Sequence, residues 1–425
     1  MQKAQLVWTT QKRKVDDLLP YEKNPRKISD NQLADLKRSL KKFNLVEIPA
    51  IDEDGKIIAG HQRVKVLQIL GRGQEEIDVR VPNRKLTQEE YEQYLLTSNA
   101  VGGDWDFEKL KSFDMDLLLN IGFGEDDLMH IFDDNAETED DQFDEEKELA
   151  EIKETDIKEG NLFALGSHRL LCGNSHDPEV IKKLMGKEKA SMIYNDPIYN
   201  IGLSYDKGTG GKQNYGGKVD DNKTDAEYKE FLKLGMQNSM SVAKSDAHYF
   251  YWCDQKYIGL VQELYRELGI ENRRVCMWLK NGQNPTPNVA FSKCYEPCVY
   301  GTTNKPYLSK NSQGLNEVMN KEITTGNRLI DDVLDLLDIW LVKRMAGNEM
   351  EHPTSKPPTL HEKAIRRCTR PGEIILDIYG GSGSTLLAGE MLKRKVYTCE
   401  LEPKFCQLII NRFEKYGNVK AKKLN

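Results

Sequence analysis

The chain has 425 residues and a net charge of −7, and at roughly 150 residues per domain its length predicts two or three domains. Hydrophobic residues make up 38% of the sequence, but no apolar run approaches the roughly 20 residues of a membrane-spanning helix, and the first residues lack the apolar core of a signal peptide, which argues against a membrane protein and favours a cytoplasmic one. The eight cysteines form no CxxC pair and no zinc-type Cys/His spacing, so we expect buried thiols and no metal site.

The first hundred residues alternate helix and strand signals. Ser29 is placed to cap a helix with one apolar face. Asp54-Gly55 predicts a hairpin between strand-like residues 49–52 and 56–59. Gly60-His61-Gln62-Arg63 then begins a second helix. The expected apolar face of the first helix consists of Leu33, Leu36, Leu40 and Phe43.

A Gly-x-x-Arg sequence at a strand-to-helix junction can present backbone N–H groups and a guanidinium to a phosphate. Gly60 and Arg63 are therefore candidate DNA or phosphate contacts, and a surface salt bridge of Arg63 is an equally weighted alternative.

With Asn24-Pro25-Arg26 and residues 57–63, the region from 12 to about 100 resembles the ParB N-terminal (ParB/sulfiredoxin-like) domain. The resemblance implies a smaller α+β domain over residues 1–103 that associates with DNA and the nucleoid, and it suggests a phage or mobile-element setting. His61 stands where partition proteins have an acidic residue, which argues against nucleotide hydrolysis.

Residues 104–132 predict a short helical annex, and a strongly acidic segment follows over 133–158. Residues 133–156 contain 13 Asp or Glu and two Lys, so the rest of the chain carries +4, which is compatible with a nucleic-acid partner. We expect a solvated, poorly ordered linker here. A DNA-mimicking autoinhibitory tail is the alternative.

Residues 159–425 alternate apolar strands with helical segments, which predicts a doubly wound α/β domain. The expected strands are 163–172, 192–194, 247–252, 274–279, 298–300, 374–378 and 396–399.

Residues 374–385 are a buried strand that runs into a glycine turn and then a helix. Leu386 stands where a dinucleotide fingerprint has its third glycine, and the Gly-Lys-Ser/Thr of a P-loop is missing. The next strand ends at Glu400, about twenty residues on, where an acid can bind both hydroxyls of a ribose. Glycines and an acid without a phosphate loop favour a nucleoside such as S-adenosylmethionine.

A second strand ends in Asp196-Pro197-Ile198-Tyr199. Methylating an exocyclic amine requires its lone pair to be localised on nitrogen. The Asp196 carboxylate and the Pro197 carbonyl can accept the two N–H bonds of such an amine, and the proline ring restricts the backbone that directs the carbonyl. Tyr199 can stack on a base flipped out of the duplex. The amine would then attack the methyl group directly.

The chain resembles the β-class DNA amino-methyltransferases, whose catalytic motif is Asp-Pro-Pro-Tyr. In this class the catalytic motif (194–200 here) precedes the target-recognition region (about 302–350), and the cofactor motif (374–402) comes last. Further matches lie at 168–175, 278–280, 295–301 and 352–357. The resemblance implies a Rossmann-like domain over 159–425 with a mostly parallel sheet, S-adenosylmethionine as cofactor and double-stranded DNA as partner, and it is compatible with a homodimer.

The resemblance also assigns roles to residues. Asp196 and Pro197 would accept from the target amine, and Tyr199 would stack on the base. Asn174 would lie near the adenine of the cofactor, Glu400 at its ribose, and Thr354 and Lys356 at its methionine end. The methionine part would be held by Asp377, Tyr379, Gly380, Gly381, Ser382, Gly383 and Ser384.

Three residues depart from the family pattern: Ile198 replaces the second proline, Tyr379 a phenylalanine and Asn174 an aspartate. Ile198 matters most, because losing a proline loosens the backbone around the catalytic carbonyl. We expect activity to survive.

Other interpretations stay open. Pro297-Cys298 is the dipeptide that cytosine-C5 enzymes use for covalent attack, although a buried thiol is favoured here. Asp at the head of the catalytic motif favours adenine N6 over cytosine N4. A DNA-binding protein with a non-catalytic methyltransferase scaffold is the alternative from another class. Residues 202–224 and 302–350 are candidate DNA-facing loops.

Overall fold

The computed structural model divides the chain into two compact units, Met1–Asp134 and Asn135–Asn425, which are described separately. It describes residues 5–27, 30–99, 104–120, 123, 125–132, 138–141, 143–202, 221–284, 293–309, 338–342, 356–417 and 419–425.

The first unit is built on a four-stranded sheet of order β1-β5-β3-β4. Its elements are β1 (Trp8–Lys14), η1 (Val15–Asp17), β2 (Arg26–Lys27), α1 (Asp30–Phe43), β3 (Ala50–Ile51), β4 (Ile57–Ala59), α2 (His61–Ile69), β5 (Glu76–Pro82), α3 (Gln88–Asn99), β6 (Asp104–Trp105), α4 (Phe107–Leu110), α5 (Met115–Asn120) and α6 (Glu125–Phe132). One cluster of buried side chains joins α1 and α2 to the sheet, and a second joins α3 to the three helices that follow.

Most expectations for this unit agree with the structure. Strands β3 and β4 pair antiparallel across the Asp54-Gly55 turn, and Gly60 precedes α2 in the left-handed conformation at φ 94°. Phe43 differs from the expectation, since 61% of it is exposed at the last turn of α1. The expected annex is part of this unit, because Leu110, Phe113 and Leu118 pack in the same cluster as the helix α3 side chains.

The second unit contains a ten-stranded sheet of order β13-β11-β12-β10-β9-β14-β15-β8-β7-β16. Its elements are α7 (Glu145–Glu151), β7 (Leu162–Leu165), β8 (His168–Cys172), α8 (Pro178–Met185), β9 (Ala190–Asn195), α9 (Asp225–Ser241), β10 (Ala243–Trp252), η2 (Gln255–Tyr257), α10 (Ile258–Leu268), β11 (Glu271–Asn284), β12 (Lys293–Thr302), β13 (Ile339–Leu341), α11 (Pro358–Cys368), β14 (Ile374–Asp377), α12 (Ser384–Met391), β15 (Lys395–Glu400), α13 (Pro403–Gly417) and β16 (Lys422–Lys423).

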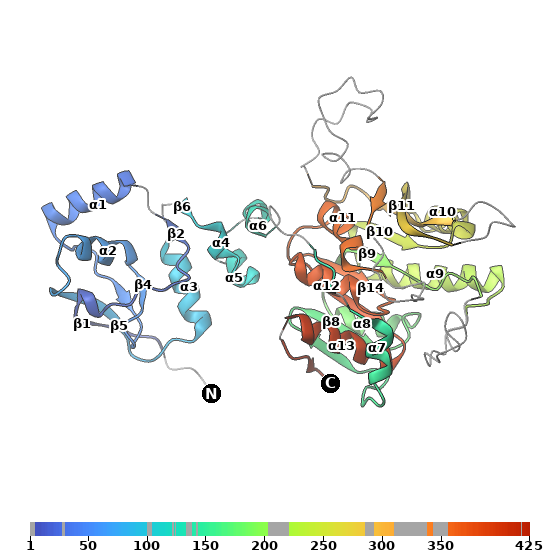
Figure 1. Ribbon diagram of the computed structural model, residues 1–425, viewed down its shortest axis with the longest axis horizontal. Coiled ribbons are helices and arrows are strands. Elements are labelled where there is room, and N and C mark those ends of the chain that lie inside the picture. Colours follow the sequence, from blue (N-terminus) through green and yellow to red (C-terminus); the bar gives the residue numbers. More distant parts are fainter. Residues whose placement is uncertain are drawn as a thin grey trace, which may run out of the picture. The chain divides into compact units, whose positions relative to one another are not determined.

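The five central strands β10, β9, β14, β15 and β8 run parallel, and antiparallel pairs flank them on both sides. Every residue of β9 is buried, as expected for a strand covered on both faces. Side chains of α11, α12 and α13 pack against one face and those of α8, α9 and α10 against the other. This three-layer arrangement, visible in Figure 1, is the mixed, largely parallel α/β fold that the strand pattern predicts.

The acidic segment was expected to be a solvated linker, and that expectation is wrong for residues 138–141 and 143–152. Leu149 and Ile152 pack on Leu408 of α13, and Asp141 forms an ion pair with Arg412. A segment can carry high charge and still be ordered where its acids meet basic partners and its apolar side chains are buried.

Within the described ranges, no helix is long and apolar enough to cross a membrane.

Candidate active site

The predicted site residues come together at one edge of the central sheet. Because β8, β15, β14 and β9 are parallel, their carboxyl ends share this edge, which is where ligands of such sheets bind. The residues at or just beyond these ends are Asn174, Glu400, Asp377 and Asp196.

Asp196 lies in a compact polar cluster with Tyr199, Glu296 and Lys356. Lys356 Nζ is 2.5 Å from one Asp196 carboxylate oxygen and 2.9 Å from the Tyr199 hydroxyl oxygen. The Tyr199 hydroxyl is 3.0 Å from the other Asp196 oxygen and 3.2 Å from Glu296 Oε2. Glu296 Oε2 is in turn 3.6 Å from Lys356 Nζ. Four side chains from three distant parts of the chain therefore share one hydrogen-bond network.

The cluster holds two carboxyl groups and one ammonium, of which Lys356 and Glu296 are buried and the Asp196 side chain is 30% exposed. Burial raises the pKa of Asp196, and the neighbouring Lys356 opposes that rise. For Lys356, burial alone would lower the pKa, but Asp196 and Glu296 outweigh it and hold the pKa above its ordinary value. Burial, followed by the charges of Asp196 and Glu296, raises the pKa of Tyr199, which keeps its hydroxyl protonated. The lysine can neutralise only one of its two acidic neighbours at a time.

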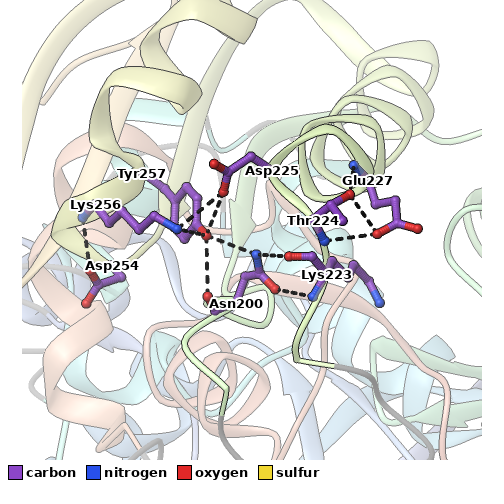
Figure 2. Close-up of polar contacts among 8 residues, drawn as sticks. All are labelled: Asn200, Lys223, Thr224, Asp225, Glu227, Asp254, Lys256 and Tyr257. Atoms are coloured by element: carbon purple, nitrogen blue, oxygen red, sulfur yellow. Dashed lines mark hydrogen bonds and ion pairs between the residues drawn. The ribbon is translucent and has the colours of Figure 1, made fainter.

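Hydrogen bonds at Ile198 and Asn200 hold the backbone that follows Asp196. The Tyr228 hydroxyl on α9 donates to the Ile198 carbonyl at 2.7 Å. Asn200 has φ 52°, and its carboxamide bonds both the N–H and the carbonyl of Lys223 as well as the Tyr257 hydroxyl. Figure 2 shows Asn200 between these partners. The restraint that a second proline would supply at position 198 is thus supplied by hydrogen bonds.

Replacing Tyr228 by Phe tests this restraint, because it removes the bond to Ile198 and leaves the ring. We expect kcat for the methyl transfer predicted from the sequence to fall about 5- to 10-fold, as for the loss of one hydrogen bond, with little change in the KM for the cofactor. Adding Ile198→Pro to the Tyr228→Phe variant should restore much of the rate, since the Ile198 N–H donates no hydrogen bond among the described residues. Equal rates for Tyr228→Phe and the parent would argue against this role.

The glycine turn follows β14 and lies against the end of β15. Gly380 N donates to the Cys399 carbonyl at 2.9 Å, and Gly381 N donates to Glu400 Oε2 at 2.8 Å. A Cβ on Gly380 would lie 2.7 Å from Thr398 Oγ1, whereas one on Gly381 would meet nothing closer than 3.9 Å. Gly380 is therefore required for close packing within the turn, and Gly381 for the left-handed backbone there, at φ 51°.

The residues at this turn fit S-adenosylmethionine. Each Glu400 oxygen accepts one backbone N–H, from Glu402 and Gly381, and a carboxylate has further lone pairs for two ribose hydroxyls. Burial raises the pKa of Glu400 to about 7 and that of Asp377 to about 8. The guanidinium at the turn, Arg412, is already paired with an aspartate. The turn therefore suits a nucleoside better than a phosphate.

Other predicted cofactor residues have partners within the protein. The Ser384 hydroxyl bonds His361 Nε2 at 2.8 Å, and the Ser382 hydroxyl accepts from Arg412. Asn174 Oδ1 accepts from the backbone N–H of His176. Lys356 lies with Asp196, so its predicted contact with the cofactor stays a prediction, and Thr354 is outside the described residues.

Tyr379 is accommodated by its surroundings. Its hydroxyl is 3.2 Å from His176 Nε2, and a Cβ on Gly235 of α9 would lie 2.5 Å from that hydroxyl oxygen. The glycine makes room for the extra atom that distinguishes tyrosine from phenylalanine.

Sequence reasoning missed Glu296 and Tyr228 as site residues. Glu296 stands in the apolar strand β12, and a buried acid in such a strand was the available signal. Tyr228 has no comparable signal, because a tyrosine on a helix is usually a packing residue.

Three further predictions concern Cys298, Arg63 and the expected DNA-facing loops. Cys298 is fully buried, and burial raises the pKa of its thiol well above the ordinary value, which supports a structural thiol rather than a nucleophile. Arg63 pairs with Glu47. Residues 203–220, 310–337 and 343–350, where most of the expected DNA-facing loops fall, lie outside the described residues.

Comparisons with known proteins found similarities for the methylase-like part of the chain and for its N-terminal part. A family model described as DNA methylase matches residues 190–411. The type II methyltransferase M.HpaI of Haemophilus parainfluenzae is 23% identical over 254 residues, which are 59% of this chain and 75% of that protein. A crystal structure of the M1.HpyAVI–SAM complex aligns with a TM-score of 0.41 at 20% identity, covering 57% of this chain and 97% of that chain. A Pnob8-like ParB-N domain aligns with a TM-score of 0.23 at 19% identity, covering 30% and 49%. Because the family match spans more than half of the 425 residues, the chain belongs to the N6/N4 DNA methylase family.

Proposed function

We propose that this chain transfers a methyl group from S-adenosylmethionine to the N6 amine of adenine in double-stranded DNA. The family is S-adenosylmethionine-dependent and acts on DNA. The observation that carries the proposal is the cluster of Asp196, Tyr199, Glu296 and Lys356 at the end of β9, next to the strand β14 that leads into the glycine turn. This arrangement supports an amine acceptor and a methyl donor at one edge of the sheet.

The cofactor supplies an electrophilic methyl group on a sulfonium. In the proposal, Asp196 and the Pro197 carbonyl accept the two N–H bonds of the amine, and no described residue donates to that carbonyl in the free protein. These acceptors favour a lone pair localised on nitrogen. The bound cofactor would supply the methyl group to the amine nitrogen, and the Asp196 carboxylate would take the proton that the amine loses.

The charge of the cluster supports this proton transfer. With Asp196 and Glu296 ionised and Lys356 protonated, the cluster carries one net negative charge. When the amine occupies Asp196, Lys356 can pair with Glu296, 3.6 Å away. Asp196 is then free to accept the proton, and the cluster becomes neutral instead of positive. Glu296 is in this way a positioning residue for Lys356.

Adenine is favoured over cytosine because the catalytic motif begins with Asp rather than Ser. The test is to incubate the protein with labelled S-adenosylmethionine and mixed DNA duplexes, digest the DNA and identify the labelled nucleoside. We expect N6-methyladenine. Label only in N4- or C5-methylcytosine would refute the choice of base, and label in neither despite cofactor binding would favour the non-catalytic scaffold.

Cofactor affinity should depend on pH through Glu400. Ribose hydroxyls donate to the ionised carboxylate, so protonation below a pKa of about 7 should weaken binding. We expect the Kd for S-adenosylmethionine to rise as pH falls from 8 to about 5.5, approaching tenfold per unit below the pKa. Titration calorimetry across this range measures it. Glu400→Gln should bind weakly at every pH and remove the part of the dependence centred near pH 7, leaving any part that comes from Asp377, whose pKa is about 8. A pH-independent Kd in the parent would exclude the assigned role.

For the first unit we propose DNA association through the turn from Gly60 to Arg63. Since Arg63 pairs with the exposed Glu47, a phosphate would have to compete with that carboxylate. Arg63→Ala is expected to reduce DNA affinity and its salt dependence. Unchanged binding at several salt concentrations would leave only the ion pair as its role.

A further inference from the structure

We infer that the described residues of the acidic segment, 138–141 and 143–152, are a structural part of the cofactor site, and that Asp141 positions the glycine turn through Arg412. The inference rests on the proposed use of the turn for S-adenosylmethionine. It assigns Asp141 and Arg412 as positioning residues, since neither contacts the site of methyl transfer directly.

The contact between Asp141 and Arg412 is bidentate. Arg412 Nε is 2.6 Å from one carboxylate oxygen of Asp141, and Arg412 Nη2 is 2.8 Å from the other. The remaining nitrogen, Nη1, donates to the Ser382 carbonyl at 3.1 Å and to the Ser382 hydroxyl at 3.2 Å. One guanidinium thus connects the acidic segment to the middle of the glycine turn.

This ion pair is not an ordinary surface pair. The side chains of Arg412 and Asp141 are only 4% and 11% exposed. The Phe143 ring lies 4.4 Å from the guanidinium carbon and covers it. A buried guanidinium needs a counter-charge to remain in place, and Asp141 supplies it. Without Asp141, the Arg412 side chain would move toward solvent and its hydrogen bonds to Ser382 would be lost.

The same segment also reaches the helix that follows Lys356. Thr138 donates from its backbone N–H to a Glu362 carboxylate oxygen at 2.9 Å, and the Thr359 hydroxyl donates to Asp140 at 2.9 Å. Glu362 and Thr359 belong to α11, which begins two residues after Lys356. The acidic segment therefore contacts both the glycine turn, which is proposed to bind the cofactor, and the start of α11, which follows Lys356 of the Asp196 cluster.

A carboxyl-to-amide change at position 141 tests the inference in the full-length chain. Asp141→Asn keeps the shape of the side chain and removes its charge. The matched control is Glu148→Gln on the same acidic segment. Glu148 forms an ion pair with the exposed Lys415 of α13, away from the glycine turn. The Kd for S-adenosylmethionine is measured by calorimetry and kcat at saturating cofactor.

We expect Asp141→Asn to weaken cofactor binding about 5- to 10-fold with kcat nearly unchanged, and Glu148→Gln to bind like the parent. Asp141→Glu should recover part of the loss, since it restores the charge. Parent-like affinity in Asp141→Asn would overturn the inference while leaving the proposed function intact. A parent that binds no S-adenosylmethionine would instead refute the proposed function.

Hydrogen exchange of the unmodified protein gives a second test if the variant does not fold. Coupling between two sites is reciprocal, so S-adenosylmethionine should slow amide exchange in α7 and at residues 138–141. The amides of α10, which pack on the opposite face of the sheet, serve as the internal control. Protection confined to the turn, with none in the acidic segment, would contradict the inference.

Discussion

Asp196→Asn should lower kcat for methyl transfer by at least about 10³-fold and change the Kd for S-adenosylmethionine by less than about twofold. The amide retains one oxygen acceptor, but it carries no charge to stabilise the amine as it becomes positive and cannot take its proton. Lys356 keeps Glu296 as a partner, so the fold should tolerate the change. Single-turnover rates at saturating cofactor measure the effect.

The control is Asp78→Asn, which removes a carboxylate from the exposed pair with Lys12 in the first unit. We expect its kcat to equal that of the parent. If Asp196→Asn keeps more than a tenth of the parent rate, Asp196 is not the acceptor, and the non-catalytic scaffold becomes the better description.

Lys356→Met is expected to reduce the free energy of unfolding by about 3–5 kcal/mol at neutral pH, because it leaves the buried Glu296 and the partly exposed Asp196 without a counter-charge. Burial already raises the pKa of Asp196. A carboxyl whose pKa is higher in the folded than in the unfolded state loses stability as pH rises between the two values. The deficit should therefore be largest at neutral pH and shrink as pH falls toward about 4.

Denaturant unfolding at several pH values measures this deficit. Lys256→Met, at an exposed ion pair, should cost no more than about 1 kcal/mol. Adding Glu296→Gln to Lys356→Met should recover part of the loss, since one of the two opposed charges is removed. A pH-independent deficit would mean that Lys356 stabilises the fold through packing rather than charge.

Local patterns predicted the central parts of the fold. The strand ending at Asp377, the glycine turn and Glu400 are close in sequence, and hydrophobic periodicity and glycine chemistry identify them. Asp196 could be singled out because its neighbours in sequence form a recognisable motif. The hairpin at Asp54-Gly55 was predicted for the same reason.

Partners far apart in sequence could not be predicted. Lys356 is 160 residues from Asp196, and no periodicity shows that their side chains meet. The same holds for Tyr228, which restrains the Ile198 carbonyl from α9. For the acidic segment, composition suggested a solvated chain, but Asp141 finds its partner 271 residues away on α13. Composition gives the charge of a segment, but it does not show whether the folded chain offers basic side chains to pair with it.

The most direct test of the central claim is a structure of the full chain with S-adenosylmethionine and a duplex containing its methylated sequence. We predict that the target base leaves the helix, that its exocyclic nitrogen lies within hydrogen-bond distance of Asp196 and of the Pro197 carbonyl, and that Glu400 binds the ribose hydroxyls of the cofactor. Lys356 should lie closer to Glu296 than to Asp196. A cofactor bound away from the glycine turn, or a target amine bound away from Asp196, would contradict the assignment of this site.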